Sequence, residues 1–244
     1  MVDRRDHTRK VEETYDAEAD QFNTKAPQLL TWVHIVEPAI SRHLKEAYGN
    51  AKNLKVLDVG SADGRVVAVH LAHGVQAGNV TGVELSDKQV QIAKSKYPDA
   101  NFIHGDISST QLPKGEFDLV SIMMVLEFLT EEQLDDAFAS IWQAMKQGAT
   151  LMYVSTHPHR VEGKYGLSPN HEGQIMTTHP WGSEEYPNWH RSVKRYIQQT
   201  EDAGFVIDSV EELEMPQEVQ HEHPEFKSFG APARLVVVAH KPVA

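Results

Sequence analysis

VLDVGSADG, at residues 56–64, is the stretch of sequence that decides the fold. The apolar run 54–59 that leads into it and stops at a glycine is typical of a buried parallel strand. Gly60 and Gly64 allow a sharp turn, because glycine tolerates positive φ and leaves no Cβ between the backbone and a ligand. Amide N–H groups and the positive end of a helix dipole face the space above such a turn. The stretch therefore predicts a nucleotide site.

Strands and helices alternate on both sides of this turn. We expect strands at 54–59, 79–85, 101–104, 117–123, 149–155, 205–210 and 235–240, and helices at 6–23, 28–48, 64–73, 87–97, 131–146 and 192–203. Strands that alternate with helices at this spacing predict a parallel sheet with right-handed crossovers.

Two segments depart from this alternation. Residues 156–191 contain five histidines and show no clear period, and loops of such length are usually lids or binding loops. We therefore expect the substrate there. Residues 211–225 contain six glutamates and no lysine or arginine, which predicts a solvated acidic loop.

Composition limits the class of protein. A chain of 244 residues with 40% hydrophobic and 24% charged residues fits one globular α/β domain. Its net charge of -12 disfavours nucleic acid and anionic membranes as partners. The absence of cysteine excludes disulfides and thiolate metal sites. Because residues 1–11 are charged and no apolar run approaches a membrane span, we expect a cytoplasmic protein.

Three acidic residues follow or end successive predicted strands: Asp58, Glu84 and Asp106. Ligands of open α/β sheets bind at the carboxyl ends of the strands, so these carboxylates share one crevice. An acid at the second strand suits the two hydroxyls of a ribose, and Asp106 suits the amine of an adenine. The turn lacks the G-x-G-x-x-G spacing of dinucleotide sites, and the chain has no G-x-x-x-x-G-K-[ST] motif. The predicted ligand is an adenosine without a pyrophosphate.

Four segments carry a family resemblance: LDVGSADG (57–64), GVELS (82–86), GDI (105–107) and FDLV (117–120). In order and spacing they resemble the class I S-adenosylmethionine-dependent methyltransferases. The resemblance implies a Rossmann-like α/β fold, with a mostly parallel seven-stranded sheet and helices on both faces. It divides the chain into an N-terminal helical cap (1–50), a cofactor-binding core (51–155), a lid (156–191) and a C-terminal part of the core sheet (192–244). Ala62 and Ala149 stand where the family often has glycine.

The resemblance also implies which residues bind S-adenosylmethionine and its product S-adenosylhomocysteine. The glycine turn would contact the amino-acid part of the cofactor, Glu84 the ribose and Asp106 the adenine amine, with aromatic side chains over the sulfonium. The implied set is Tyr15, Phe22, Gly60, Ser61, Ala62, Gly64, Glu84, Leu85, Asp106, Ile107, Met123 and Met124.

A general base is needed only if the methyl acceptor must lose a proton, and histidine is the natural candidate. The lid contains His157, His159, His171, His179 and His190. His190 is the first catalytic candidate and His157 the second, with Arg191 beside His190. The pairs His157/His159 and His221/His223 resemble metal-ligand spacing on extended segments, but we expect no metal, since such pairs arise easily among 14 histidines.

We therefore expect a methyltransferase that acts on an O or N atom of a small molecule. Two alternatives stay open. One is a non-catalytic module that binds S-adenosylmethionine or S-adenosylhomocysteine, and the other is a methyltransferase that acts on protein or tRNA. Residues 121–124 lack the Asn/Asp-Pro-Pro-aromatic motif of nucleobase-amine methyltransferases, which weakens the nucleic-acid alternative. The sequence does not fix the acceptor or the oligomeric state.

Overall fold

The computed structural model describes residues 3–160, 166–178, 185–224 and 232–243. Their central feature is a seven-stranded sheet in the order β3-β2-β1-β4-β5-β9-β8. The strands are β1 (Val56–Val59), β2 (Val80–Glu84), β3 (Asn101–His104), β4 (Phe117–Met123), β5 (Met145–Thr156), β8 (Val206–Leu213) and β9 (Arg234–His240). Neighbours from β3 to β5 pair in parallel, and β9 is antiparallel to both β5 and β8. The predicted mostly parallel sheet is confirmed.

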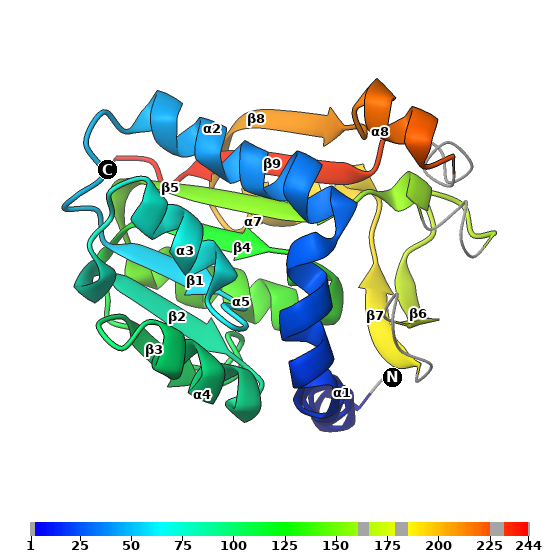
Figure 1. Ribbon diagram of the computed structural model, residues 1–244, viewed down its shortest axis with the longest axis horizontal. Helices are drawn as coiled ribbons and strands as arrows, with labels where there is room; N and C mark the ends of the chain where they lie inside the picture. The colour runs from blue at the N-terminus through cyan, green and yellow to red at the C-terminus, as the bar shows by residue number, and fades with distance from the viewer. Residues whose placement is uncertain (1–2, 161–165, 179–184, 225–231, 244) are drawn as a thin grey trace.

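Helices cover both faces of this sheet, as Figure 1 shows. They are α1 (Arg4–Lys25), α2 (Glu37–Ala47), α3 (Arg65–Ala72), α4 (Asp87–Lys96), α5 (Glu131–Ala144), α7 (Val193–Asp202) and α8 (Gln217–Glu222), with short helical turns at Ala26–Gln28, Trp32–Val36, Ala77–Asn79 and Leu126–Phe128. Within the described ranges, no helix has the length and apolar character needed to cross a membrane.

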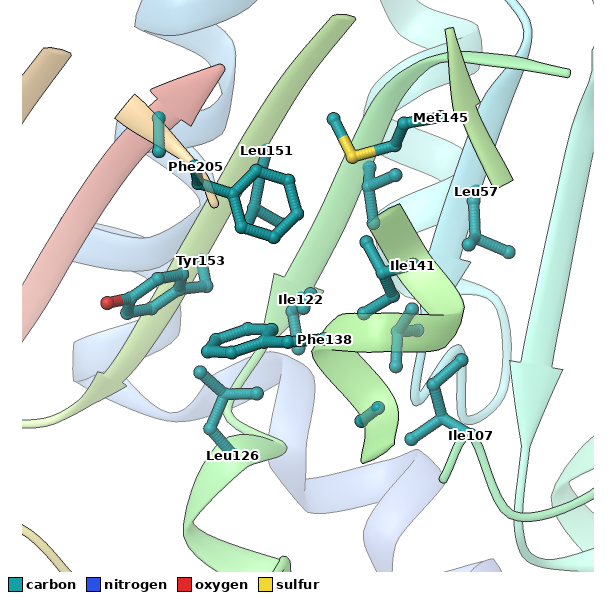
Figure 2. Close-up of a cluster of buried hydrophobic side chains, with 14 of the residues drawn as sticks. Leu57, Ile107, Ile122, Leu126, Phe138, Ile141, Met145, Leu151, Tyr153 and Phe205 are labelled. Carbon is teal, nitrogen blue, oxygen red and sulfur yellow. The ribbon is translucent and has the colours of Figure 1, made fainter. Parts of the chain in front are cut away.

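The sheet has an apolar face on each side because β5 alternates its side chains between them. Leu151 and Tyr153 face α5, where Phe138 and Ile141 pack against the sheet (Figure 2). Met152 and Val154 belong to the opposite cluster, which α2, α3 and α4 cover. The apolar clusters on the two faces hold the sheet in place. They thereby also position the loops that follow the carboxyl ends of the parallel strands.

The helix expected at 28–48 is not continuous. A π-helical turn, Trp32–Val36, precedes α2, and the amide of Glu37 donates to the carbonyl of Trp32. Pro38 has no N–H to donate to the carbonyl four residues earlier, which explains the wider turn. The π turn brings Trp32 and Val36 into the wall of the cavity described below.

The predicted acidic loop at 211–225 is wrong. Strand β8 continues to Leu213, and α8 follows. Two isolated apolar residues between the glutamates, Met215 and Val219, are buried against Ile35 and Ala233. Burial of these side chains outweighs the surrounding charge.

The lid is more regular than the sequence indicated. Strands β6 (Gly173–Thr177) and β7 (Tyr186–His190) form an antiparallel two-stranded sheet. It lies beside α1 at the carboxyl edge of the central sheet (Figure 1). The lid histidine His179 lies outside the described residues.

Candidate active site

A cavity of about 350 Å³ lies at the carboxyl ends of the parallel strands, within the size range of small-molecule sites. Its walls come from the segments that follow β1, β2, β3, β4 and β5, from α1 and from the hairpin β6–β7. Eleven of the twelve residues predicted to bind the cofactor line it: Tyr15, Phe22, Gly60, Ser61, Ala62, Glu84, Leu85, Asp106, Ile107, Met123 and Met124. Gly64 stands outside the lining, where a Cβ would come 2.7 Å from the ring of Tyr97.

Glu84 is the buried carboxylate that holds the glycine turn in place. Its Oε2 accepts from the amide of Ala62 at 2.8 Å, and its Oε1 accepts from the amide of Ser86 at 2.9 Å. Burial raises the pKa of Glu84, and these backbone hydrogen bonds oppose the increase. Each carboxylate oxygen can accept a further hydrogen bond. This arrangement fits a ribose that presents two hydroxyls.

Asp106 caps the turn after β3. Its Oδ1 accepts from the amide and hydroxyl of Ser108 at 2.9 and 2.6 Å, and its Oδ2 accepts from Nε2 of Gln133 at 3.3 Å. The side chain of Ile107, next to it, is buried in the core and also reaches the cavity. A carboxylate beside an apolar surface fits an adenine ring with its exocyclic amine.

The glycine turn is strained at the alanine that the sequence analysis singled out. Ala62 has φ +44°, in the left-handed region. Ala62→Gly should increase the free energy of unfolding by about 0.5–1 kcal/mol, because relief of about 1–2 kcal/mol of strain exceeds the added chain entropy of glycine. Urea denaturation measures the change. As a control, Ala203→Gly, at φ -74°, should lower stability instead. Equal losses in both variants would contradict strain at Ala62.

A buried hydrogen-bond chain lies under the turn. Ser121 Oγ donates to Asp58 Oδ1 at 3.1 Å and lies 3.0 Å from Nε2 of His70. Burial raises the pKa of Asp58 to about 8 and lowers the pKa of His70 to about 3. Asp58 is absent from the cavity lining. The expectation that all three carboxylates share one crevice is therefore wrong for Asp58, whose side chain is buried and accepts from Ser121.

The depressed pKa of His70 predicts a stability loss in acid. The unfolded state binds a proton at His70 below pH about 6.5, whereas the folded state does so only near pH 3. Stability should therefore fall as the pH drops from 6.5, by up to about 1.4 kcal/mol per pH unit for this group. Urea titrations between pH 7 and 5 should show a smaller slope for His70→Gln than for the exposed control His34→Gln. Equal slopes would show that His70 does not cause the pH dependence of stability.

Helix α1 lies over the cavity because polar contacts hold it on α4. Asp16 Oδ1 accepts from the hydroxyl of Ser86 and, at 3.2 Å, from the amide of Lys88. Tyr15 packs edge-on against Phe22 and Phe128, with ring centroids 5.5 Å apart in both pairs. All three rings line the cavity.

Arg65 is a site residue that the sequence analysis missed. Its guanidinium carbon lies 4.5 Å from the ring centroid of Phe22 and 5.6 Å from that of Trp32. Its Nε pairs with Asp63 at 3.0 Å, while Nη2 is buried without a hydrogen-bond partner among the described atoms. Arg65 lines the cavity directly after the glycine turn, so a basic residue at the first helical position was the available signal.

Of the two histidine candidates, His190 is the one that lines the cavity. Its Nδ1 donates to the backbone carbonyl of His171, which leaves Nε2 as the basic nitrogen of the neutral ring. Burial lowers the pKa of His190, and the backbone groups of His171 and Pro158 oppose this decrease. The ring is therefore held in a tautomer that can accept a proton.

His157 lies outside the cavity lining. Its ring is 1% exposed, pairs through Nε2 with Glu212 at 2.7 Å, and stacks on His159 with centroids 5.2 Å apart. The interpretation of His221/His223 as a pair on an extended segment is wrong, because His221 lies in α8. No group of three or more potential metal ligands occurs in the described parts of the chain.

Arg191 lines the cavity, but its guanidinium already donates hydrogen bonds to backbone oxygens. Nη1 donates to the carbonyl of Leu126 at 3.0 Å, Nη2 donates to that of Leu129 at 2.7 Å, and Nε pairs with Glu131 at 2.8 Å. The side chain is fully buried. These contacts tie the end of β7 to the segment after β4.

The part of the cavity away from the glycine turn is polar and aromatic. Phe128 and Tyr186 stack there with centroids 5.8 Å apart, and Glu127, Arg160 and Arg234 also line it. Motifs gave no signal for these residues, because they come from four separate segments of the chain, with only Glu127 and Phe128 adjacent.

Comparisons with known proteins show similarity to methyltransferases. A family model described as a methyltransferase domain matches residues 56–148. The ubiquinone/menaquinone biosynthesis C-methyltransferase of Psychromonas ingrahamii is 29% identical over 120 residues, which cover 46% of this chain and 47% of that protein. An arsenite methyltransferase of Rattus norvegicus is 26% identical over 120 residues, covering 43% of this chain and 32% of that protein. The chain thus spans at most about half the length of these curated relatives.

Solved structures share the fold. A putative S-adenosylmethionine-dependent methyltransferase from Listeria monocytogenes is 21% identical, with a TM-score of 0.67 over 86% of this chain and 99% of that one. The 1,6-didemethyltoxoflavin-N1-methyltransferase of Burkholderia thailandensis, solved with its substrate and S-adenosylhomocysteine, is 13% identical, with a TM-score of 0.68 over 100% of this chain and 92% of that one. Residues 56–148 thus match a methyltransferase domain, and the chain has the Rossmann-like fold of S-adenosylmethionine-dependent methyltransferases.

Proposed function

We propose that this protein transfers a methyl group from S-adenosylmethionine to an O or N atom of a small molecule. One observation carries the proposal: a single cavity joins the glycine turn and Glu84 to an aromatic and polar wall that includes His190. Bound cofactor supplies a methyl group on a positively charged sulfur. The protein then has to hold the acceptor in line with that methyl in a dry pocket.

Each cofactor part has a candidate partner in this chain. Backbone of the turn at Gly60 and Ala62 lies against the amino-acid part, and the buried Nη2 of Arg65 suits its carboxylate. Glu84 accepts from the ribose hydroxyls, and Asp106 accepts from the adenine amine. The remaining proposed contacts are with Ser61, Leu85, Ile107, Met123 and Met124 around the ligand and with Tyr15 and Phe22 above it.

His190 is the proposed general base, because its Nε2 is the proton-accepting nitrogen and its ring lines the cavity. Arg191 is a proposed positioning residue, since its donors hold the backbone of the neighbouring wall. His157 is a weaker proposal for the base, because Glu212 occupies its Nε2 outside the lining. The lid 156–191 and the N-terminal helices form the proposed acceptor pocket.

Calorimetry with S-adenosylmethionine and S-adenosylhomocysteine, followed by an acceptor screen that measures S-adenosylhomocysteine release, tests this function. Binding with turnover of a small O- or N-nucleophile supports it. Binding without turnover of any small molecule, protein or tRNA indicates a non-catalytic module. Turnover of tRNA or protein alone would contradict the small-molecule proposal, as would methyl transfer only to carbon.

A further inference from the structure

Arg234 is a buried cation in the cavity wall, and the proposed cofactor contacts do not use it. It begins β9 and is 8% exposed. Its Nη1 donates to the carbonyl of Ala233 and its Nη2 to the hydroxyl of Thr31, both at 2.9 Å. A guanidinium carries five N–H donors, and its Nε is buried with no partner among the described atoms. The site therefore holds more donors than acceptors.

The charged groups around Arg234 do not supply the acceptors that its guanidinium lacks. Burial lowers the pKa of Arg234 to about 9, the charge of Arg160 lowers it further, and Glu127 raises it. Arg234 therefore still carries its positive charge at neutral pH. No ion pair joins it to a carboxylate of the described chain, although Glu127 lines the same cavity. Glu127 Oε1 accepts from the hydroxyl of Thr156 at 3.2 Å instead.

A buried charge without its full set of partners is costly, and a ligand that supplies them relieves the cost. A guanidinium matches the geometry of carboxylate and phosphate oxygens. Aromatic rings line the same cavity, since Phe128 stacks on Tyr186, and Trp32 and Tyr196 lie in the lining as well. The features of this wall therefore match an anionic group attached to a flat apolar body.

We propose that Arg234 binds an anionic oxygen group, a carboxylate or a phosphate, carried by the methyl acceptor. This inference rests on the proposed function, because it assigns the acceptor to the cavity beside the cofactor. It narrows the acceptor class to small acids with an apolar, ring-containing body. Arg234 is a binding residue in this role and takes no part in the methyl transfer itself.

Calorimetry with three probes tests the inference in the presence of saturating S-adenosylhomocysteine. Benzoate and phenyl phosphate supply the two anionic groups, and benzamide is their uncharged match. We expect at least one anion to bind more tightly than benzamide. Arg234→Met should weaken that anion by about ten- to a hundredfold, the loss of one hydrogen bond to a charged group, and should leave benzamide unchanged. The stronger of the two anions identifies carboxylate or phosphate.

The matched control is Arg42→Met, which removes an exposed arginine that pairs with Glu211 on β8 outside the cavity. It should leave anion binding as in the parent protein. If Arg234→Met does not fold by circular dichroism, Arg234→Lys takes its place and should weaken the anion while keeping the charge. Equal affinity for benzamide and both anions, or anion binding unchanged without Arg234, would overturn the inference. If the parent protein does not bind S-adenosylhomocysteine, that result contradicts the proposed function instead.

Discussion

Glu84→Ala is expected to weaken S-adenosylhomocysteine binding by roughly a hundredfold or more. In the proposed complex the Glu84 carboxylate accepts two ribose hydroxyls, and each hydrogen bond to a charged group contributes about 1.5–3 kcal/mol. The variant also releases the amides of Ala62 and Ser86, so the turn loses its support as well. Isothermal calorimetry gives the dissociation constants directly.

Two further variants separate ribose binding from turn support. Glu84→Gln keeps one acceptor oxygen and should fall between the parent protein and Glu84→Ala. Glu116→Ala removes a half-buried carboxylate that pairs with Lys55 away from the cavity, and it should bind as the parent does. Circular dichroism establishes that each variant is folded at the temperature of the titration. An unchanged affinity in folded Glu84→Ala would remove this residue from the cofactor site.

Gly60→Ala is expected to lower the free energy of unfolding by about 2–5 kcal/mol and to impair cofactor binding. Two effects add: Gly60 has φ +69°, which costs an alanine about 1–2 kcal/mol, and overpacking costs about 1–3 kcal/mol more. The new Cβ would lie 2.2 Å from Cγ2 of Val125. Valine cannot move that methyl group easily, because its χ1 is restricted. Urea denaturation measures the loss.

Gly115→Ala is the matched control, because Gly115 has φ +60° and no atom within 4 Å of its added Cβ. It should show the backbone cost alone. The double variant Gly60→Ala/Val125→Ala, compared with both single variants, isolates the packing part as a coupling energy. If Gly60→Ala lowers the free energy of unfolding no more than Gly115→Ala does, Val125 can move aside without a cost in stability.

Most of the sheet could be predicted from sequence because apolar periodicity and turn residues agree there. β4 reads as an apolar run, and its buried pattern confirms a central strand. Prediction from the sequence failed where tertiary contacts decide the structure of a segment more strongly than its composition does. Met215 and Val219 draw an acidic segment into the fold, and Pro38 converts part of a helix into a π turn. The pairing of β6 with β7 depends on two short strands with little periodicity of their own.

That the residues around the glycine turn line one cavity could be predicted, because they follow successive strands in one short region of the chain. The opposite wall could not. Arg234 and Glu127 lie 107 positions apart in the chain, and only the sheet order brings β9 beside β5 and so close to the segment after β4. Arg191 looked like a catalytic neighbour of His190, and only the structure shows that its donors hold Leu126 and Leu129.

Those Arg191 contacts bear on how the cavity admits a ligand. Two hydrogen bonds and one ion pair to the 126–131 segment hold the chain just after β7, so this end of the hairpin is a fixed anchor and not a hinge. Any swing of the hairpin must either break a buried guanidinium network or carry Glu127 and Phe128 along with it. An acceptor that enters by displacing the hairpin therefore also changes the shape of the cavity wall that it will contact.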